Sequence, residues 1–210
     1  MHKQPIEQKT KRVLEIIAKE PFSKNFYLAG GTALAILLEH RESIDLDWFK
    51  TESFSHENIK KQLKHASNFE ITKEDAGTLH CLINGVKTSF LLYPYKNLFP
   101  LIDFESIKMA DERDIATMKV DAISSRGSKK DFVDLYFLLE KYSLDEILKF
   151  FSEKYHDIKY NKVHILKSLT YFESAEKEPM PNMIKEVEWE EIKKVITEKT
   201  RSFLTKERRK

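Results

Sequence analysis

The sequence predicts an α/β (α+β) fold, in which a small mixed β-sheet flanked by helices is followed by a helical C-terminal part. Residues 26–49 show the order strand, Gly-Gly turn, helix, strand. Three short strand patterns separated by turn signals lie between residues 69 and 93, and helical patterns dominate after Pro100. We therefore expect a core at residues 1–105 and a helical part at residues 106–210, packed together as one compact unit.

The first elements each have a local signal. Residues 6–19 carry apolar side chains at helical spacing and end before Pro21, which predicts a packing helix. Phe26–Ala29 is a short apolar strand candidate, and Ala33–Leu38 is an unbroken apolar run of helix-forming residues. A helix that is apolar on all sides is expected to be buried.

Gly30 and Gly31 stand between that strand and that helix. Two of the five glycines of the chain are thus adjacent where the backbone must turn sharply or approach another group. At this position the first N–H groups of the helix can face an anion, and Thr32 adds a hydroxyl. The alternative interpretation is a turn that serves packing alone.

The next strand, residues 44–49, carries two carboxylates. Its period of two separates two faces: Ile44, Leu46 and Trp48 on one, and Asp45, Asp47 and Phe49 on the other. Aspartates at i and i+2 have Cα atoms roughly 6.5 Å apart, close enough to hold one divalent cation or bridge two. The alternative is a solvated acidic face of an edge strand. Together with the glycine turn, the pair suits phosphoryl or nucleotidyl transfer.

The following elements are predicted to continue the sheet. Ser55 can cap a helix at residues 56–65. The strand candidates are residues 69–73, 78–83 and 86–93, separated by Gly77 and Asn84-Gly85. We expect these strands to form an antiparallel extension of the sheet, and residues 93–100 to leave it as a loop.

Helices are predicted for the rest of the chain. Residues 173–183, which contain two prolines, are the best linker candidate. The predicted helices cover residues 111–125 and 128–142, and three more begin at Ser143 (with Glu146 in capping-box position), Asn161 and Glu188.

The helix pair at residues 111–142 carries a second polar group. Its members are Lys119, Arg126, Asp131 and Asp134. The two cations are seven residues apart, nearly two turns, so we expect them to share a helix face. A lysine point charge, an arginine fork and an aspartate proton acceptor would suit chemistry on a triphosphate. Alternatively, Asp131 completes a cap begun by Ser128, and Asp134 pairs with Lys130 or Arg126.

Both polar groups belong to one family pattern. An apolar residue, Gly30-Gly31, thirteen residues, and Asp45-x-Asp47 resemble the signature of the polymerase-beta-type nucleotidyltransferase superfamily. The stretch GGTALAILLEHRESIDLDWF is most similar to its AbiEii/AbiGii toxin branch. Lys119, Arg126 and the segment from Lys130 to Leu135 are similar to the same family, which often has arginine at position 130. The resemblance covers roughly residues 26–139.

The resemblance implies a nucleotidyltransferase fold and Mg²⁺- or Mn²⁺-dependent transfer of a nucleotidyl group from a nucleoside triphosphate (NTP). The implied acceptor is an RNA, tRNA included, or a protein, and the implied role is the toxin of a toxin–antitoxin or abortive-infection system with a cognate antitoxin. The implied site has Asp45 and Asp47 as catalytic metal ligands, Lys119 on the triphosphate, Asp131 as base, and Gly30, Gly31, Thr32, Arg126 and Asp134 around the nucleotide.

One feature departs from the pattern of the superfamily. A third carboxylate usually comes from a neighbouring later strand, but residues 86–92 contain no acid. Either Asp131 or Asp134 completes the site, or one metal suffices, or the chemistry has been lost. The rival functions are therefore an inactive nucleotide- or RNA-binding module with the same fold and, as a third candidate, a phosphotransferase.

Composition sets the remaining expectations. The 36 basic and 34 acidic residues give a net charge of +2, which neither requires nor excludes a nucleic-acid partner. Cys81, the single cysteine, suits a reducing compartment and is expected in the core. No apolar run reaches the length of a membrane span, and Met1–Glu20 is unlike a signal peptide, so we expect a cytoplasmic protein without a membrane partner.

Two other classes of site are disfavoured by spacing. The seven histidines show no His-x-x-x-His pattern and the single cysteine cannot form Cys-x-x-Cys, which argues against a zinc site. The Gly-x-Ser-x-Gly elbow of serine hydrolases is also absent.

Overall fold

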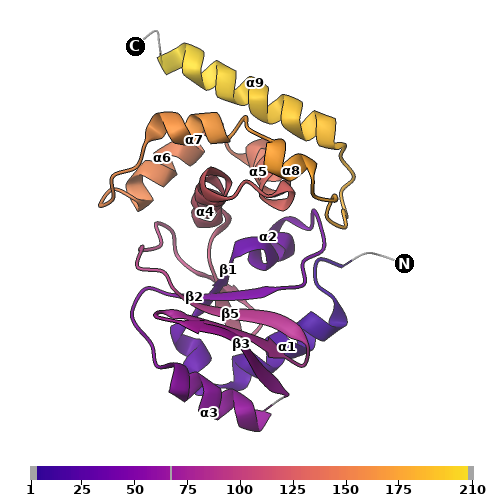
Figure 1. Ribbon diagram of the computed structural model, residues 1–210, viewed down its shortest axis with the longest axis vertical. Coiled ribbons are helices and arrows are strands. Elements are labelled where there is room, and N and C mark those ends of the chain that lie inside the picture. Colours follow the sequence, from indigo (N-terminus) through magenta and orange to yellow (C-terminus); the bar gives the residue numbers. More distant parts are fainter. Residues whose placement is uncertain (1–3, 67, 208–210) are drawn as a thin grey trace. The chain divides into compact units, whose positions relative to one another are not determined.

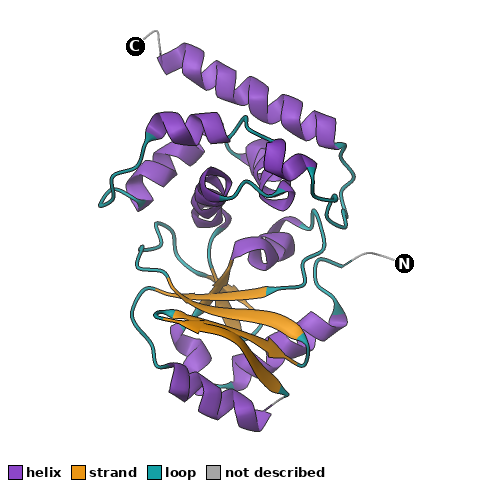
Figure 2. Cartoon of the chain, in the orientation of Figure 1, coloured by secondary structure: helices purple, strands orange, loops and turns teal. Residues whose placement is uncertain are grey.

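A computed structural model describes residues 4–66 and 68–207 of the chain. The chain divides into two compact units, Met1–Asp111 (unit 1) and Glu112–Lys210 (unit 2) (Figure 1). The named strands all belong to unit 1, and the described elements of unit 2 are helices (Figure 2). The predicted mixed α/β architecture is therefore confirmed.

Unit 1 is built on a seven-stranded mixed sheet in the order β3-β4-β5-β2-β1-β7-β6. The strands are β1 (Tyr27–Ala29), β2 (Leu46–Lys50), β3 (Phe69–Asp75), β4 (Thr78–Ile83), β5 (Val86–Leu92), β6 (Ile102–Phe104) and β7 (Ile107–Met109). Its helices are α1 (Gln8–Lys19), the 3₁₀ helix η1 (Pro21–Asn25), α2 (Gly30–Leu38) and α3 (His56–Ala66). The predicted strand–turn–helix–strand order of residues 26–49 is thus present.

The sheet differs from the prediction in two of its pairings. Strands β3, β4 and β5 are antiparallel to one another as expected, but β5 joins the sheet parallel to β2. In addition, β6 and β7 form a hairpin beside β1, where only loop and helix were predicted after Pro100. Each of these two strands has three residues, too few to show a period of two, and their pairing with β1 depends on residues distant in sequence.

The strand that carries Asp47 begins later than predicted. β2 starts at Leu46, so Asp45 precedes it, and Ile44 is 56% exposed instead of sharing the face of Leu46 and Trp48. The backbone before β2 has other partners: the carbonyl of Ile44 accepts a 3.3 Å bond from the Thr10 hydroxyl. This hydrogen bond lies outside the strand pairing that the alternation of residues 44–49 predicted for Ile44.

The core of unit 1 lies mainly between the sheet and the helices α1 and α3, while α2 lies on the opposite side of the sheet (Figure 1). Phe22, Phe26 and Phe90 pack edge to face at centroid distances of 5.5–6.1 Å. Cys81 is buried as predicted, and burial raises the pKa of its thiol to about 12. This thiol is therefore protonated near neutral pH and is a poor metal ligand or nucleophile.

Unit 2 contains the helices α4 (Glu112–Ser125), α5 (Lys129–Lys141), α6 (Leu144–Lys154), α7 (Lys162–Ser168), α8 (Glu173–Glu176) and α9 (Trp189–Glu207). The predicted capping box of Ser143 and Glu146 is present at α6, and the Asn161 side chain accepts two backbone N–H bonds at α7. The proposed linker at residues 173–183 instead contains the short helix α8.

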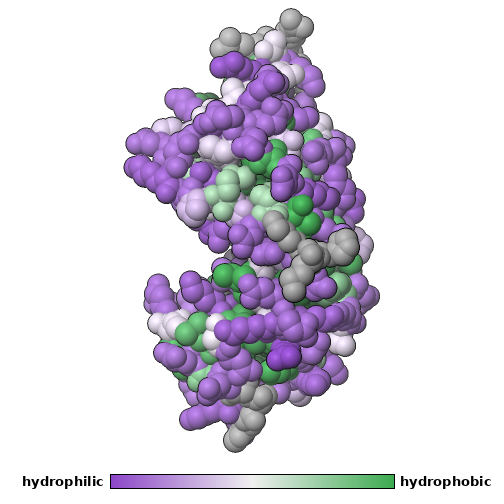
Figure 3. All heavy atoms as spheres, turned by 90° about the vertical axis from the view of Figure 1, so that its right-hand side faces the viewer, coloured by the Kyte–Doolittle hydropathy of each residue, from purple (hydrophilic) through white to green (hydrophobic). Residues whose placement is uncertain are grey.

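The surface is predominantly hydrophilic on the face shown in Figure 3, with hydrophobic side chains in small groups. None of the described helices combines the length and apolar character that a membrane span requires.

A fully buried ion pair links two helices of unit 2. Lys154 Nζ on α6 lies 2.7 Å from Asp114 Oδ1 on α4, and both side chains are inaccessible to solvent. Burial lowers the pKa of Lys154, although Asp114 opposes this effect. Removing either member of this pair should therefore lower the free energy of unfolding, because the other charge would stay buried without it.

Asp114→Ala should lower the free energy of unfolding by about 3–5 kcal/mol, because it leaves the Lys154 ammonium buried without this partner. The double variant Asp114→Leu/Lys154→Met should recover most of that loss. Urea denaturation measures both, and a double variant no more stable than Asp114→Ala would contradict this account.

Candidate functional site

The N-terminus of α2 follows β1 without a connecting loop. Gly30 is the first residue of α2 and has φ +71°, in the left-handed region that favours glycine. A Cβ atom built on Gly30 would lie 3.3 Å from Asp47 Oδ2. The glycine therefore permits a close approach between the helix N-terminus and the carboxylate. The initial N–H groups of α2 lack intrahelical acceptors, as at every helix start.

Gly31 is close to a cation that the sequence analysis did not select. A Cβ atom at Gly31 would lie 2.6 Å from Arg41 Nη2. Arg41 is only 3% exposed, and its Nη1 donates a 2.9 Å bond to the carbonyl of Glu42. Its guanidinium adds a permanent positive charge to the positive end of the α2 dipole. Nothing in the local sequence distinguished Arg41 from a surface arginine.

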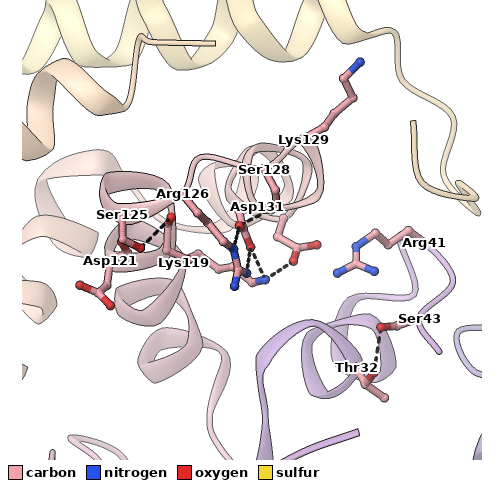
Figure 4. Close-up of polar contacts among 12 residues, drawn as sticks. Thr32, Arg41, Ser43, Lys119, Asp121, Ser125, Arg126, Ser128, Lys129 and Asp131 are labelled. Carbon is pink, nitrogen blue, oxygen red and sulfur yellow. Dashed lines mark hydrogen bonds and ion pairs between the residues drawn. The ribbon is translucent and has the colours of Figure 1, made fainter. Parts of the chain in front are cut away.

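The Thr32 hydroxyl forms hydrogen bonds within the protein. The side chain is buried, donates to the backbone carbonyl of Asp45, and shares a 2.8 Å bond with the Ser43 hydroxyl (Figure 4). The hydroxyl is thus bonded within the protein, where it fixes the segment that leads into β2. Thr32 supports the position of Asp45.

Asp45 and Asp47 both line one cavity of about 460 Å³ on the sheet. Its other lining residues come from β3, β4 and β5: Thr72, Lys73, His80, Cys81, Leu82, Lys87, Thr88 and Ser89. Asp47 and Ser89 are paired in register, and Ser89 is in turn paired with His80. The position beside Asp47 on β5 is therefore a serine, in agreement with the absence of an acidic residue from positions 86–92.

The two carboxylates determine which metal could bind. Among the residues that the structure describes, no three His, Cys, Asp or Glu side chains are grouped to hold a metal ion. Mg²⁺ is often held by one or two carboxylates together with water and substrate phosphates. Asp45 and Asp47 therefore fit a Mg²⁺ ion that arrives with a triphosphate better than a metal held by protein ligands alone.

The second polar group lies within unit 2 and converges on Asp131 (Figure 4). Arg126 forms a bidentate pair with it, Nε to Oδ2 at 2.8 Å and Nη2 to Oδ1 at 3.0 Å. Lys119 Nζ lies 3.0 Å from Asp131 Oδ1 and 2.6 Å from Asp134 Oδ2. The Ser128 hydroxyl donates to Asp131 Oδ2 at 2.7 Å. All four predicted residues of unit 2 therefore belong to one cluster.

These contacts differ from the structural alternative that the sequence left open. Ser128 is the N-cap residue of α5, but it makes no side-chain cap hydrogen bond, so the predicted capping role is not realised. Asp134 pairs with Lys119, a partner that the structural alternative did not consider. Arg126 lies just beyond the end of α4, and it still reaches the same carboxylate as Lys119.

The environment of Asp131 keeps it ionised. Burial acts to raise the pKa of Asp131, but Lys119, Arg126 and Ser128 together lower it to about 2. Both carboxylate oxygens accept hydrogen bonds. Lys119 and both aspartates are buried, whereas the Arg126 side chain is 59% exposed.

Comparisons with known proteins cover nearly the whole chain. The family model described as "Nucleotidyl transferase AbiEii toxin, Type IV TA system" matches residues 12–207. The uncharacterized protein aq_aa25 of Aquifex aeolicus (strain VF5) is 36% identical over 209 residues, which cover 95% of this chain and 98% of that protein.

Solved structures share the fold. MenT4, a nucleotidyltransferase toxin from Mycobacterium tuberculosis H37Rv, has a TM-score of 0.56 and 13% identity over 92% of this chain and 85% of its own. The crystal structure of a Helicobacter pylori protein has a TM-score of 0.56 and 18% identity over 95% of this chain and 96% of its own. At these identities the likeness shows the fold alone.

Gly30→Ala should lower the free energy of unfolding by about 1–2 kcal/mol, because alanine is strained at φ +71° and its methyl group would press on the Asp47 carboxylate. Gly31→Ala is the matched control. Its backbone is not left-handed, and its clash involves the flexible end of Arg41, so it should cost less. Urea denaturation that ranks the two variants in the opposite order would refute this role for Gly30.

Asp131→Asn should reduce the acid sensitivity of the fold. The pKa of Asp131 falls from 3.8 to about 2 on folding, so its ionised form stabilises the protein above about pH 4 and that contribution is lost as the pH falls through 2. About 2 kcal/mol of the acid-induced loss should be missing in the variant, as measured by urea denaturation from pH 5 downward. Asp157→Asn, at an exposed carboxylate of unit 2, is the control, and an identical pH dependence in wild type and Asp131→Asn would contradict this assignment.

Proposed function

The chain belongs to the AbiEii family of nucleotidyl transferase toxins, and from this membership we propose that it transfers a nucleotidyl group from an NTP to an RNA or protein acceptor with Mg²⁺ or Mn²⁺. The chain is a nucleotidyltransferase by its family. The observation that carries the proposal is the approach of Asp47 to Gly30 at the start of α2, with Asp45 lining the same cavity. Anion-binding N–H groups and metal-binding carboxylates are thus adjacent.

In the proposed reaction, the acceptor hydroxyl loses its proton to a base and its oxygen attacks the α-phosphorus of the NTP. The bond from that phosphorus to the bridging oxygen breaks, and pyrophosphate leaves. Asp45 and Asp47 would hold the divalent cation, which neutralises charge on the phosphate oxygens. The N–H groups at Gly30 and Gly31, with the Arg41 guanidinium, would bind phosphate oxygens.

The unit 2 cluster supplies further positive charge in this proposal. Lys119 and Arg126 would interact with the triphosphate, and Asp131 with Asp134 would keep the lysine oriented. For Asp131 we propose this anchoring role in place of the base role that the family resemblance implies. A carboxylate with a pKa of about 2 and two bonded oxygens is a weak proton acceptor near neutral pH.

The biological setting follows from the family description. A toxin of a type IV toxin–antitoxin system is expected to have a cognate antitoxin, and we propose that this chain has one and acts in the cytoplasm, where NTPs and RNA are available. Expression of the chain alone should then slow growth, and co-expression of its antitoxin should relieve the effect.

A binding module without catalysis is the second candidate, and the observation that favours it is Ser89 beside Asp47. Incubation with NTPs labelled at the α-phosphate, Mg²⁺ and total cellular RNA or protein tests both functions. Label transferred to an acceptor supports the nucleotidyltransferase. Binding without transfer supports the module, and transfer from γ-labelled NTP alone indicates a phosphotransferase.

Replacing both carboxylates, Asp45→Asn with Asp47→Asn, should abolish Mg²⁺-dependent NTP binding while leaving the protein at least as stable, because two neighbouring like charges are removed. Calorimetry with and without Mg²⁺ measures the affinity, and urea denaturation measures the stability. Asp103→Asn, at an exposed carboxylate on β6 of the same sheet, is the control. Unchanged affinity in the double variant would rule out the metal assignment.

A further inference from the structure

Four side chains form one row across the sheet of unit 1. The register pairs Lys73 on β3 with His80 on β4, His80 with Ser89 on β5, and Ser89 with Asp47 on β2. Side chains of directly paired residues project from the same face of a sheet. All four residues line the cavity of about 460 Å³ that also contains Asp45, so the row crosses the proposed metal site.

His80 and Ser89 are in direct contact within this row. His80 Nδ1 lies 3.0 Å from Ser89 Oγ. If the serine oxygen accepts the Nδ1 proton, the neutral imidazole carries its lone pair on Nε2, the form that a proton acceptor requires. In this arrangement the serine holds the orientation of the imidazole ring, as an orienting group does for a catalytic base.

Other groups in this cavity are poor proton acceptors. Asp45 and Asp47 are assigned to the metal, and burial keeps the Cys81 thiol protonated. The remaining charged side chains of the lining, Lys73 and Lys87, are cations. Asp131, in unit 2, is held by three donors and stays ionised. Among the described lining residues, His80 is the one side chain suited to take up a proton.

We propose that His80, oriented by Ser89, is the base that activates the acceptor hydroxyl in the transfer reaction. Ser89 is the β5 residue paired with Asp47, and His80 is its partner on the next strand, β4. The inference rests on the proposed nucleotidyl transfer. The acceptor O–H bond breaks and its proton passes to Nε2, the oxygen forms a bond to the α-phosphorus, and pyrophosphate leaves. The imidazolium then releases the proton to water.

The first test separates binding from turnover. His80→Gln should lower the rate of label transfer from α-labelled NTP by at least about a hundredfold, a typical contribution of a base, with the Mg²⁺-dependent NTP affinity unchanged within about twofold by calorimetry. His56→Gln, at a histidine of α3 that pairs with Glu74 outside the cavity, is the matched control and should keep full transfer. Transfer by His80→Gln at the wild-type rate would overturn the inference and leave the proposed function intact.

The second test uses chemical rescue and a signal that does not depend on turnover. Added imidazole should restore transfer to His80→Ala but not to Asp45→Asn with Asp47→Asn, and a failure to rescue a folded His80→Ala would count against a base role. Nitrogen NMR of the wild-type imidazole should show the proton on Nδ1, with that preference reduced in Ser89→Ala. A proton on Nε2 in the wild type would refute the orientation. Wild-type protein that transfers nothing would overturn the proposed function itself.

Discussion

The left-handed turn at Gly30 is the constraint on which unit 1 depends. Because this residue has φ +71°, α2 can begin directly after β1, the strand that joins β2 to β7 in the sheet. The absent Cβ atom also leaves space for the Asp47 carboxylate, which would otherwise meet it at 3.3 Å. A single glycine thus sets both the start of the helix and its distance from the acidic strand, and both are needed for the proposed NTP site.

In unit 2 the corresponding constraint is charge burial. α4 contributes Lys119 to the pairs with α5 and Asp114 to the pair with α6. Separating either residue from its partner would leave a charge in an apolar interior, so the pairs penalise other packings of these helices. The Asp131 cluster combines this structural role with an arginine whose side chain is 59% exposed.

The proposed chemistry assigns metal binding and proton uptake to different residues. Asp45 and Asp47 supply the negative charge that a divalent cation needs. The residue paired with Asp47 on β5 is Ser89, which is hydrogen-bonded to His80. A neutral imidazole can accept a proton without adding a further negative charge to a site that already holds two. The absence of a strand carboxylate is therefore compatible with catalysis in this fold.

Much of the fold was predictable because the relevant signals are local. The glycine pair before an apolar helix, the Asn84-Gly85 hairpin and the caps at Ser143 and Asn161 depend on residues a few positions apart, and each is present in the structure. The Asp-x-Asp alternation also predicted a strand, which begins at Leu46 instead of Ile44. The candidate residues of unit 2 were identified as well, although a local cap was an equally valid interpretation of Asp131.

The sequence by itself therefore determined the order of most elements and which residues carry the acidic and basic groups of the candidate site. Only the tertiary structure decided that β5 pairs parallel with β2 and that β6 and β7 extend the sheet. It also decided two hydrogen bonds, one from the Thr32 hydroxyl to the Asp45 carbonyl and one between His80 and Ser89. The physical reason is that helix and turn preferences depend on neighbours within about four residues, whereas strand pairing and side-chain contacts join segments that are distant in sequence.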